Sequence, residues 1–407
     1  MREYDVAIVG GRVAGASLAI LLAQQGRRVV VIDRDTFPSD TLSTHFVGAN
    51  GVDNFARLGV LDGLLDAGFR RITRTRTGIG DCIFEGPAAP GATGFALAPR
   101  RDVLDSLLQG QAVEAGAELL TRTSVERLVE DGERVVGVVA DGREIGAHVV
   151  VGADGKTSKV AQWVGAKAYR EAAPQRPAYY GYFRGVAPLA EPTVELHFVD
   201  HTVGFLFPMR PGEDCLALEL QPDDFDAFRA DPQATFEERY RALQGMEERL
   251  RGATLEGKLK GTKGVANYLR VPYGPGWALT GDAAYLKDPI TGLGIGDALV
   301  QAFLLADALG ACLDGADWST TMTAYHEHRD RALLPLYELT LGALEDGFLA
   351  PDELDRLRAL LANPFTARSL SSWLPENLAS CLPPARLALA ELTARGFGRA
   401  RGAMVAP

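Results

Sequence analysis

The first 35 residues contain two short apolar runs, separated by a glycine-rich turn and a helical pattern. Residues 4–9 (YDVAIV) and 29–33 (VVVID) are rich in β-branched residues, which is typical of parallel strands buried on both faces. Between them, residues 16–26 (ASLAILLAQQG) have the apolar spacing of a helix that ends at Gly26. A strand, a glycine turn, a helix and a second strand within about thirty residues predict one βαβ unit.

The next part of the chain changes from helical to strand-like spacing. Residues 102–119 predict a helix. The runs that follow predict hairpin strands that turn at Asp131-Gly132 and at Asp141-Gly142, because Asp-Gly pairs favour tight hairpin turns. They end in a third apolar strand, HVVVGADG.

A separate block of alternating residues interrupts these parallel elements. Residues 176–222 are rich in aromatic and β-branched residues and predict an antiparallel sheet. A polar helical region, 223–251, precedes another buried strand in WALTGDAA, and residues 318–400 predict helices with a first proline break at Pro335. The order of the elements predicts a discontinuous α/β domain with a sheet domain inserted into it.

Composition narrows the range of functions. The 407 residues are 47% hydrophobic and 23% charged with a net charge of −11, which argues against nucleic acid or an anionic membrane as the partner. The four cysteines are scattered without a C-x-x-C pair, so no metal site is predicted. We find no signal sequence, and the apolar stretch 298–313 is too short and too polar for a transmembrane segment, so we expect a cytoplasmic location.

The turn VGGRVAGAS is close to the G-x-G-x-x-G fingerprint of dinucleotide-binding proteins, with Arg12 in place of the second glycine. Gly10 would make the tight turn and Gly15 would allow close packing of the helix on the strand, as the first and third glycines of the fingerprint do. Gly11, next to Arg12, adds no side chain to the turn. An arginine here would bring a guanidinium toward the phosphates. Asp33 ends the second strand, where an acid is expected to bind ribose hydroxyls. The alternative is a βα turn whose glycines serve only packing.

Two later segments distinguish FAD from NAD. Residues 152–160 (GADGKTSKV) and 281–294 (GDAAYLKDPITGLG) resemble the second and third flavin motifs of the group A flavoprotein monooxygenases. This superfamily includes aromatic hydroxylases, flavin-dependent halogenases and geranylgeranyl reductases. Arg12 and the segment FPSDTLSTHFV most resemble the actinobacterial FAD-dependent oxidoreductase branch near the geranylgeranyl reductases, and the resemblance covers roughly residues 1–330.

The resemblance implies an α/β fold class. It consists of a Rossmann-like FAD-binding domain of the glutathione-reductase/aromatic-hydroxylase type, an inserted antiparallel β-sheet substrate domain and a helical C-terminal region. The implied boundaries are 1–75 with 100–175 and 270–340 for the FAD-binding domain, 76–99 with 176–269 for the sheet domain, and 341–407 for the C-terminal region.

The resemblance also implies an FAD site, in which Asp282 would hydrogen-bond the ribityl chain unless it is only a turn cap. The N–H groups at the start of the helix after Gly292 would stabilise the negative charge of a reduced flavin. The implied cofactor-binding residues are Gly10, Gly11, Arg12, Val13, Ala14 and Gly15 at the pyrophosphate, Asp33 at the adenosine ribose, Arg34 and Val125 at the adenine, Arg101 at a phosphate or ribose, Asp154 and Gly155 in the middle motif, Asp282 at the ribityl chain, and Pro289, Gly292 and Gly294 at the isoalloxazine edge.

The segment SDTLSTH lies where the family brings a loop past the flavin ring. Thr44 and His45 are therefore the candidate catalytic residues, as contacts to the flavin or the substrate. A single histidine also has a plain structural alternative.

Four aromatic residues of the predicted sheet would line the substrate pocket: Tyr180, Tyr182, Phe205 and Phe207. Alternation indicates which of them share a face but not which face is accessible, and some of them could be core. His197 and His201 in the same block are interpreted as solvated strand ends.

The predicted function is hydroxylation of a small aromatic or polyketide-like metabolite through a flavin hydroperoxide, with NAD(P)H as reductant and molecular oxygen as co-substrate. One alternative is a reductase of carbon–carbon double bonds, like the geranylgeranyl reductases. Only the Phe207-Pro208 end of their Y-x-W-x-F-P-like segment is present, and STHFVGANG replaces their active-site cysteine loop. A halogenase would need a W-x-W-x-I-P element and a positioned lysine, and neither is evident. Another alternative is a non-catalytic prenyl- or flavin-binding module. The region 341–407 would cover the pocket or form a homodimer surface.

Overall fold

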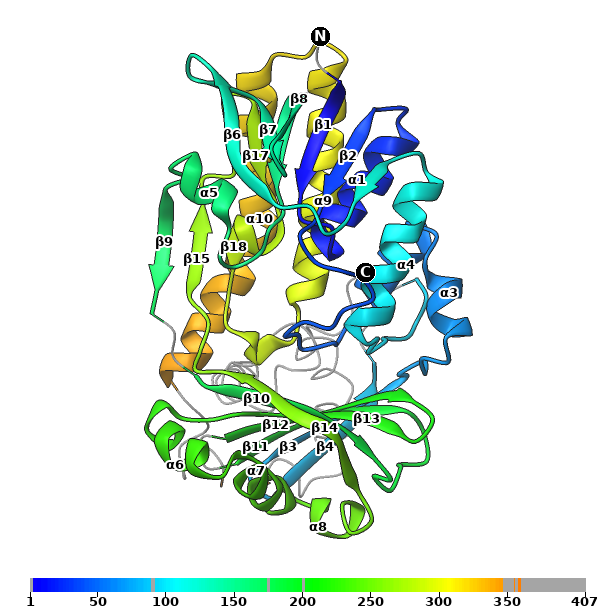
Figure 1. The fold of residues 1–407 in the computed structure, drawn as a ribbon. Coiled ribbons are helices and arrows are strands. Elements are labelled where there is room, and N and C mark those ends of the chain that lie inside the picture. The colour runs from blue at the N-terminus through cyan, green and yellow to red at the C-terminus, as the bar shows by residue number, and fades with distance from the viewer. Residues whose placement is uncertain are drawn as a thin grey trace, which may run out of the picture. The chain divides into compact units, whose positions relative to one another are not determined.

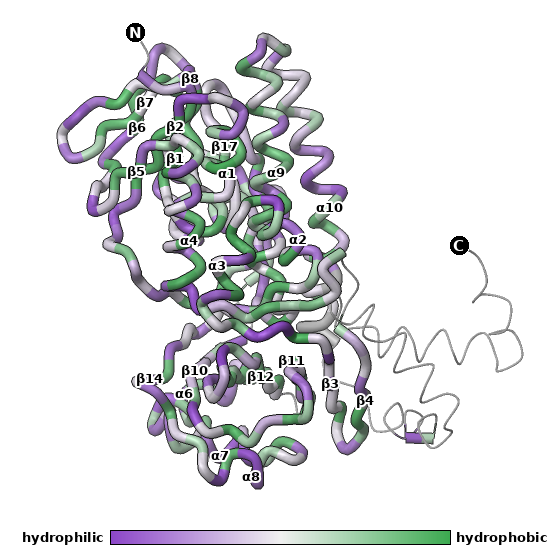
Figure 2. Tube along the Cα trace, turned by 90° about the vertical axis from the view of Figure 1, so that its right-hand side faces the viewer, coloured by the Kyte–Doolittle hydropathy of each residue, from purple (hydrophilic) through white to green (hydrophobic). Residues whose placement is uncertain are grey.

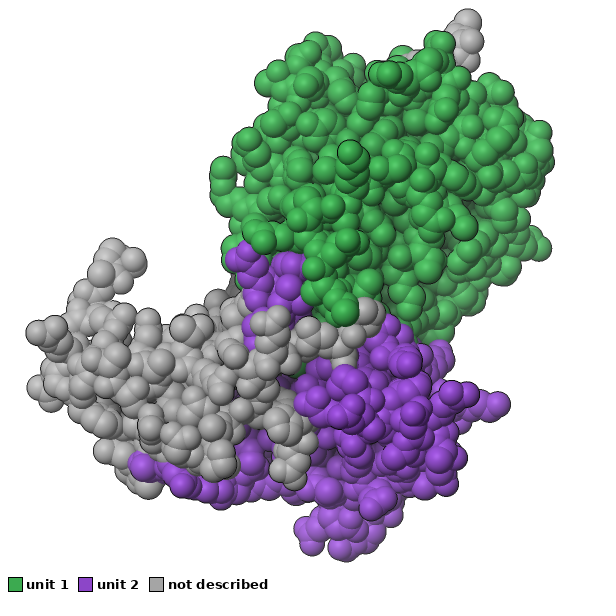
Figure 3. Space-filling model, turned by 90° about the vertical axis from the view of Figure 1, so that its left-hand side faces the viewer, with its two compact units in different colours: residues 1–69, 97–174, 265–335 green, residues 70–96, 175–264, 336–407 purple. Residues whose placement is uncertain are grey.

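The computed structural model describes residues 3–88, 92–173, 176–199 and 202–346, together with residues 355, 358 and 359. The chain divides into two units, which Figure 3 colours separately. Unit 1 is 1–69, 97–174 and 265–335, and unit 2 is 70–96, 175–264 and 336–407. The predicted boundaries at 75, 100, 175 and 270 lie a few residues from these, and most of the predicted region 341–407 lies outside the described residues.

Unit 1 is built on a mixed sheet with a parallel centre (Figure 1). β1 (Tyr4–Val9) pairs in parallel with β2 (Val29–Ile32) and β8 (Arg143–Gly152), as expected of apolar strands buried on both faces. The strand order is β16-β17-β8-β1-β2-β5, with β7 beside β8 and β6 beside β7. The other members are β5 (Glu118–Leu120), β6 (Val125–Asp131), β7 (Arg134–Ala140), β16 (Tyr273–Gly274) and β17 (Trp277–Leu279).

Two apolar helices cover this sheet. α1 (Val13–Gln24) follows β1, and Gly26 takes a left-handed φ of +77° just after the helix, as the sequence predicts. α9 (Gly294–Leu313) packs on α1 and is long and apolar enough to cross a membrane. However, 56% of the apolar part of α9 is buried inside the protein, as in the core helix of a globular protein. Figure 2 shows the apolar character of both helices.

The remaining elements of unit 1 lie around this core. The helices are α2 (Ala49–Arg57), α3 (Leu61–Asp66), α4 (Arg101–Glu114), α5 (Lys159–Trp163) and α10 (Trp318–Asp346, which continues into unit 2), with short 3₁₀ turns η2 (Gly281–Ala283) and η3 (Pro289–Thr291). A three-stranded sheet contains β18 (Tyr285–Leu286), β15 (Asn267–Arg270) and β9 (Ala168–Ala172).

Three local predictions can be compared directly with the structure. The hairpin turn at Asp141-Gly142 is confirmed, with φ values of +46° and +75° that match a type I′ turn. The helix predicted over 102–119 is wrong at its end, because Gly116 takes a φ of +106° and the next residues join β2 as strand β5. The predicted break at Pro335 is also wrong, since α10 continues through it.

Unit 2 contains a seven-stranded sheet in the order β14-β10-β13-β12-β11-β3-β4. The prediction of antiparallel pairing holds except between β11 and β3, which pair in parallel. Phe228, Phe236 and Tyr240 from the helical region pack on Leu216 and Leu218, which places the helices on one sheet face. The elements are β3 (Arg74–Ile79), β4 (Cys82–Pro87), β10 (Ala178–Arg184), β11 (Thr193–Val199), β12 (Thr202–Arg210), β13 (Glu213–Glu219), β14 (Thr254–Thr262), η1 (Pro222–Asp224), α6 (Phe225–Ala230), α7 (Pro232–Arg241) and α8 (Met246–Arg249).

Candidate functional site

The glycine turn after β1 has no room for side chains at two positions. Gly10 has a φ of +105°, and a Cβ there would lie 2.3 Å from the carbonyl oxygen of Ala153. A Cβ on Gly15 would lie 1.9 Å from the carbonyl oxygen of Gly10. Both positions require glycine, which lets α1 begin directly against the strand ends.

The start of α1 offers donors to an anion. The N–H groups of Val13, Ala14 and Gly15 belong to the first helical turn, where no intrahelical acceptor is available, and the helix dipole makes this end positive. Gly11 is fixed separately, because its N–H donates to Asp33 Oδ2 at 2.6 Å. The turn therefore has the geometry of a phosphate-binding helix start.

The carboxyl end of β2 collects the residues expected at an adenosine. The buried Asp33 side chain accepts from the N–H groups of Gly11 and Asp35, and burial raises its carboxyl pKa. The N–H of Thr123, two residues before Val125, donates to the Asp33 carbonyl oxygen at 3.0 Å. Arg34 has a side chain that is 75% exposed, so the described structure does not hold it against the other predicted residues.

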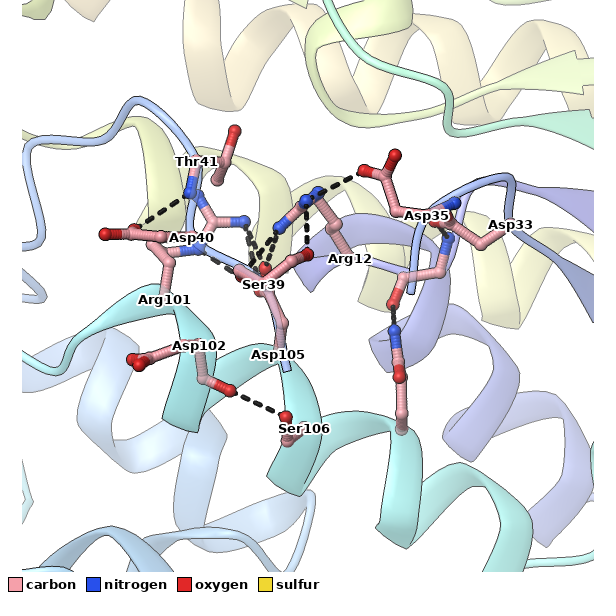
Figure 4. A network of polar contacts seen from close by, with 12 residues as sticks. Arg12, Asp33, Asp35, Ser39, Asp40, Thr41, Arg101, Asp102, Asp105 and Ser106 are labelled. Atoms are coloured by element: carbon pink, nitrogen blue, oxygen red, sulfur yellow. Dashed lines mark hydrogen bonds and ion pairs between the residues drawn. The ribbon is translucent and has the colours of Figure 1, made fainter. Parts of the chain in front are cut away.

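The Arg12 side chain lies in a polar network that the fingerprint does not predict (Figure 4). Its guanidinium donates to Asp105 Oδ2 at 2.7 Å, Asp35 Oδ2 at 2.9 Å and Ser39 Oγ at 3.0 Å. Arg101 donates to the same Asp105 carboxylate at 3.0 Å. Sequence reasoning missed Asp35, Ser39 and Asp105, although the i,i+4 spacing of Arg101 and Asp105 on a helix was a usable signal for that pair.

The Asp154 side chain of the middle motif makes its hydrogen bonds to neighbouring residues of the chain. Asp154 accepts from the N–H of Lys159, the first residue of α5, at 2.6 Å, and from the hydroxyl of Ser158, the N-cap of this helix, at 2.5 Å. Gly155 next to it takes a φ of +77°. These contacts keep Ala153 beside Gly10, which places the motif at the glycine turn through its backbone.

Asp282 of the third motif has an accessible side chain in a charged environment. It is exposed to solvent, yet desolvation by the surrounding protein raises its carboxyl pKa, while Arg101 and Lys287 lower it. Its backbone oxygen accepts from the Tyr268 hydroxyl at 2.6 Å, but its carboxylate has no hydrogen bond within the described part of the chain. The turn-cap alternative therefore has no contact to support it, and the carboxylate can accept from a ligand hydroxyl.

The structure brings the loop with the candidate catalytic residues to the third motif. Thr44 Oγ1 donates to the carbonyl oxygen of Gly292 at 3.1 Å. Gly292 takes a left-handed φ of +70° between η3, which begins at Pro289, and α9, which begins at Gly294. His45 is buried with a φ of +63°, an unusual conformation for a side chain larger than glycine.

A buried ion pair that the sequence reasoning missed links the third motif to the start of α9. Lys287 pairs with Asp297, which lies in the first turn of α9, and both side chains are buried. Pairing is what makes two charges tolerable away from water.

The four predicted pocket aromatics share one face of the unit 2 sheet. Tyr180 and Phe205 are both in register with Ala217, and Tyr182 and Phe207 with Cys215 on the same central strand, β13. The opposite face carries α6–α8. All four rings are buried, and each pair is in contact, with ring centroids 5.7 Å apart for the tyrosines and 5.8 Å for the phenylalanines.

The interpretation of His197 as a solvated strand end is wrong. His197 is buried on the helix-covered face, with Nε2 3.6 Å from Glu195 Oε2. Arg249 of α8 donates to the same carboxylate at 2.6 Å. This histidine belongs to a buried charge cluster, and His201 lies outside the described residues.

Potential metal ligands are dispersed. Within the described residues no group of three or more His, Cys, Asp or Glu side chains could hold a metal ion. Cys82 and Cys215 are buried and Cys312 is partly buried, and Cys381 lies outside the described residues.

Comparison with known proteins agrees with this geometry. The family described as an FAD binding domain matches residues 3–334. A menaquinone reductase of Mycolicibacterium smegmatis is 30% identical over 342 residues, which cover 79% of this chain and 81% of the relative. A 1H-pyrrole-2-carbonyl-(peptidyl-carrier protein) brominase of Pseudoalteromonas luteoviolacea is 25% identical over 80% of this chain and 82% of the relative. A rifampicin monooxygenase of Streptomyces venezuelae is 24% identical over 92% and 78%.

Solved structures support the fold. The flavin-dependent brominase Bmp2 superposes with a TM-score of 0.78 at 20% identity, covering 97% of this chain and 100% of that structure. The myxobacterial halogenase CndH superposes with a TM-score of 0.78 at 21% identity, covering 95% and 96%. The match to the FAD binding domain family spans residues 3–334, which is most of the chain, so this protein belongs to that family of FAD-dependent oxidoreductases.

Proposed function

We propose that this protein is an FAD-dependent monooxygenase that hydroxylates a small aromatic or polyketide-like metabolite, with NAD(P)H as reductant and molecular oxygen as co-substrate. The observation that carries the proposal is the bond between Thr44 and Gly292, which joins the 39–45 loop to the start of α9. This arrangement offers a helix N-terminus and candidate contact residues on one site. The rifampicin monooxygenase relative supports the reaction class.

The residues fit FAD at three points. The first turn of α1 and the backbone around Arg12 would bind the pyrophosphate, with Asp33 at the ribose and Arg101 nearby. The accessible Asp282 carboxylate would accept from the ribityl hydroxyls. Arg34 and Val125 would contact the adenine. Asp154 would support the site indirectly, through its bonds at the start of α5.

Residues of the third motif and of the 39–45 loop would control the reaction at the isoalloxazine end of the FAD site. Bound FAD supplies the redox chemistry, by accepting a hydride and activating oxygen. Pro289, Gly292 and Gly294 would line the edge of the ring. The N–H groups of Gly294, Ile295 and Gly296 would stabilise negative charge on the reduced ring, because they belong to the first turn of α9, at its positive end. Thr44 would fix the loop, and His45 would contact the flavin or the substrate.

The substrate class rests on the sheet of unit 2. Tyr180, Tyr182, Phe205 and Phe207 lie on a single face of the sheet, opposite α6–α8. Their rings are buried, so a flat aromatic ligand would displace packed side chains in order to stack on them. A cytoplasmic location and a homodimer stay predictions.

The test starts with the visible spectrum of the purified protein and anaerobic addition of NADH or NADPH. We expect flavin absorbance that bleaches with nicotinamide and returns with oxygen, together with oxygenated product from a panel of phenols and quinones. NAD(P)H oxidation that never yields oxygenated product would overturn the proposal. A product that requires added bromide or chloride would instead indicate a halogenase.

A second function is favoured by the menaquinone reductase relative at 30% identity. In that case the reduced flavin would transfer a hydride to a carbon–carbon double bond or a quinone. Reduction of a prenylated quinone under anaerobic conditions, without oxygen uptake in air, would support this reductase over the monooxygenase.

A further inference from the structure

Four of the five N–H groups of the Arg12 side chain donate to protein acceptors. Nη1 donates to Asp105 at 2.7 Å and to the Ser39 carbonyl oxygen at 3.5 Å, and Nη2 donates to Asp35 at 2.9 Å and to Ser39 Oγ at 3.0 Å. The guanidinium carbon also lies 5.1 Å from the centroid of the Phe37 ring. An arginine with these partners has few N–H groups left for a phosphate.

The partner on α4 is buried and shared. The Asp105 side chain has no solvent exposure, and it accepts from Arg101 at 3.0 Å as well as from Arg12. If Arg12 turned toward a phosphate, it would give up its bonds to Asp105 and Asp35, and the buried Asp105 carboxylate would keep Arg101 as its partner. The two carboxylates at Asp105 and Asp35 also offset its positive charge, so Arg12 adds little net attraction for an anion.

The partners of Arg12 on the other side belong to a segment without regular structure. Residues 33–46 form no helix and no strand, so side-chain contacts must offset the entropy of ordering them. Arg12 holds this segment at Asp35, Phe37 and Ser39, near its beginning. Thr44 holds its end at Gly292, so the two contacts fix the segment that carries His45.

We propose that Arg12 is a positioning residue, which fastens residues 35–39 to Asp105 of α4 and so orders the loop that carries Thr44 and His45, and that it does not bind the cofactor phosphate. The role of the loop at the flavin rests on the proposed function, but the fastening itself concerns the protein without cofactor. Arg12, at the position of the second fingerprint glycine, thus binds Asp35, Ser39 and Asp105 of the protein itself. The phosphate is left to the N–H groups of α1.

Hydrogen–deuterium exchange of the apo-protein tests the fastening. R12G restores the glycine of the fingerprint. R12K keeps the positive charge but loses the planar guanidinium, which donates to Asp105 and Asp35 at the same time. S39A removes only the hydrogen bond from Arg12 to the Ser39 hydroxyl. We expect peptides within residues 35–46 to exchange about tenfold faster in R12G and R12K, with a smaller increase in S39A, because local opening follows lost contacts. Unchanged exchange in all three variants would overturn the proposal, and S39A keeps the test valid if R12G does not fold.

Binding of ADP and FAD separates positioning from phosphate binding. We expect R12G and R12K to weaken FAD about tenfold or more while ADP changes less than about twofold, because ADP does not reach the far end of the loop. D105N should weaken FAD in wild type and weaken it less in R12G, where the remaining effect acts through the other partner of Asp105, Arg101. If Arg12 bound the phosphate, R12G would weaken ADP and FAD equally, and D105N would tighten ADP because a negative charge is removed.

The two proposals fail in different ways. If the wild-type protein binds no FAD, the proposed function falls, while exchange in the apo-protein still decides whether Arg12 orders the loop. If FAD binds and is reduced but R12K leaves both exchange and FAD affinity unchanged, only the positioning role is wrong.

Discussion

The hydroxyl of Thr44 donates to the carbonyl oxygen of Gly292 at 3.1 Å and so joins segments that lie 248 residues apart in the sequence. Gly292 takes its left-handed conformation just before α9, so the bond fixes the loop to the start of a core helix. This contact is the link between the candidate catalytic residues and the third flavin motif.

Replacement of Thr44 by valine removes this bond without changing the shape of the side chain much. We expect a loss of about 0.5–1.5 kcal/mol in unfolding free energy and a lower flavin-dependent turnover. Urea unfolding and NAD(P)H oxidation measure the two effects. T323V is the control, since the Thr323 hydroxyl bonds to Ser319 of α10 and to Tyr273 of β16, neither of which belongs to a flavin motif. An equal loss of turnover in both variants would contradict a special role for Thr44.

Two helical glycines provide opposite predictions. G15A would place a Cβ 1.9 Å from the Gly10 carbonyl oxygen, so we expect severe destabilisation and loss of FAD binding. G110A meets nothing within 4 Å on exposed α4, so it should stabilise the protein by about 0.5–1 kcal/mol through helix propensity. Thermal unfolding of both variants is sufficient, and a G15A protein as stable as wild type would show that the turn can relax.

We expect the Asp282 carboxylate to lower the stability of the apo-protein at pH 7 and to strengthen FAD binding. Its pKa is raised in the folded state, chiefly by desolvation, so the ionised form costs stability at pH 7 and the cost disappears at low pH, where the carboxyl is protonated in both states. D282N should therefore stabilise the apo-protein at pH 7 and weaken FAD at least about tenfold. The matched control is D307N on the exposed side of α9, which should change neither quantity; unchanged FAD affinity in D282N would remove Asp282 from the site.

Asp214 predicts a pH dependence in unit 2. Desolvation raises the pKa of this buried carboxyl to about 6, although Arg70 lies 3.3 Å away. Because the folded state holds the proton more tightly than the unfolded state, the stability of wild type should fall relative to D214N by up to about 3 kcal/mol as pH rises from about 4 to 6. Urea unfolding at several pH values tests this, with exposed D226N as the control. A wild-type to D214N difference that is constant with pH would disprove the raised pKa.

The Lys287–Asp297 pair predicts a large coupling. K287M leaves the Asp297 charge buried without its partner and should cost about 3–5 kcal/mol, while K287M/D297L should recover most of that loss. Chemical denaturation of the apo-proteins measures the double-mutant cycle. Additive losses would mean that the two side chains do not stabilise each other.

Local chemistry was sufficient for the first βαβ unit and the order of the flavin motifs. The β-branched runs at 4–9 and 29–32 form parallel strands because their pattern suits burial on both faces, and Gly10 and Gly15 are required because any Cβ would clash. The family assignment follows from the same motifs. The misplaced end of α4 shows the limit of periodicity, since residues 118–120 became a strand only because β2 offers an edge to pair with.

Contacts between distant segments were decided by the tertiary structure alone. Nothing in the sequence pairs Arg12 with Asp105, 93 residues away, or Thr44 with Gly292. Alternation predicted that Tyr180 and Tyr182 share a face, but only the packing of α6–α8 shows which face the helices cover. The physical reason is that periodicity fixes the direction of a side chain relative to its own element, whereas its partner depends on which other element the fold places beside it.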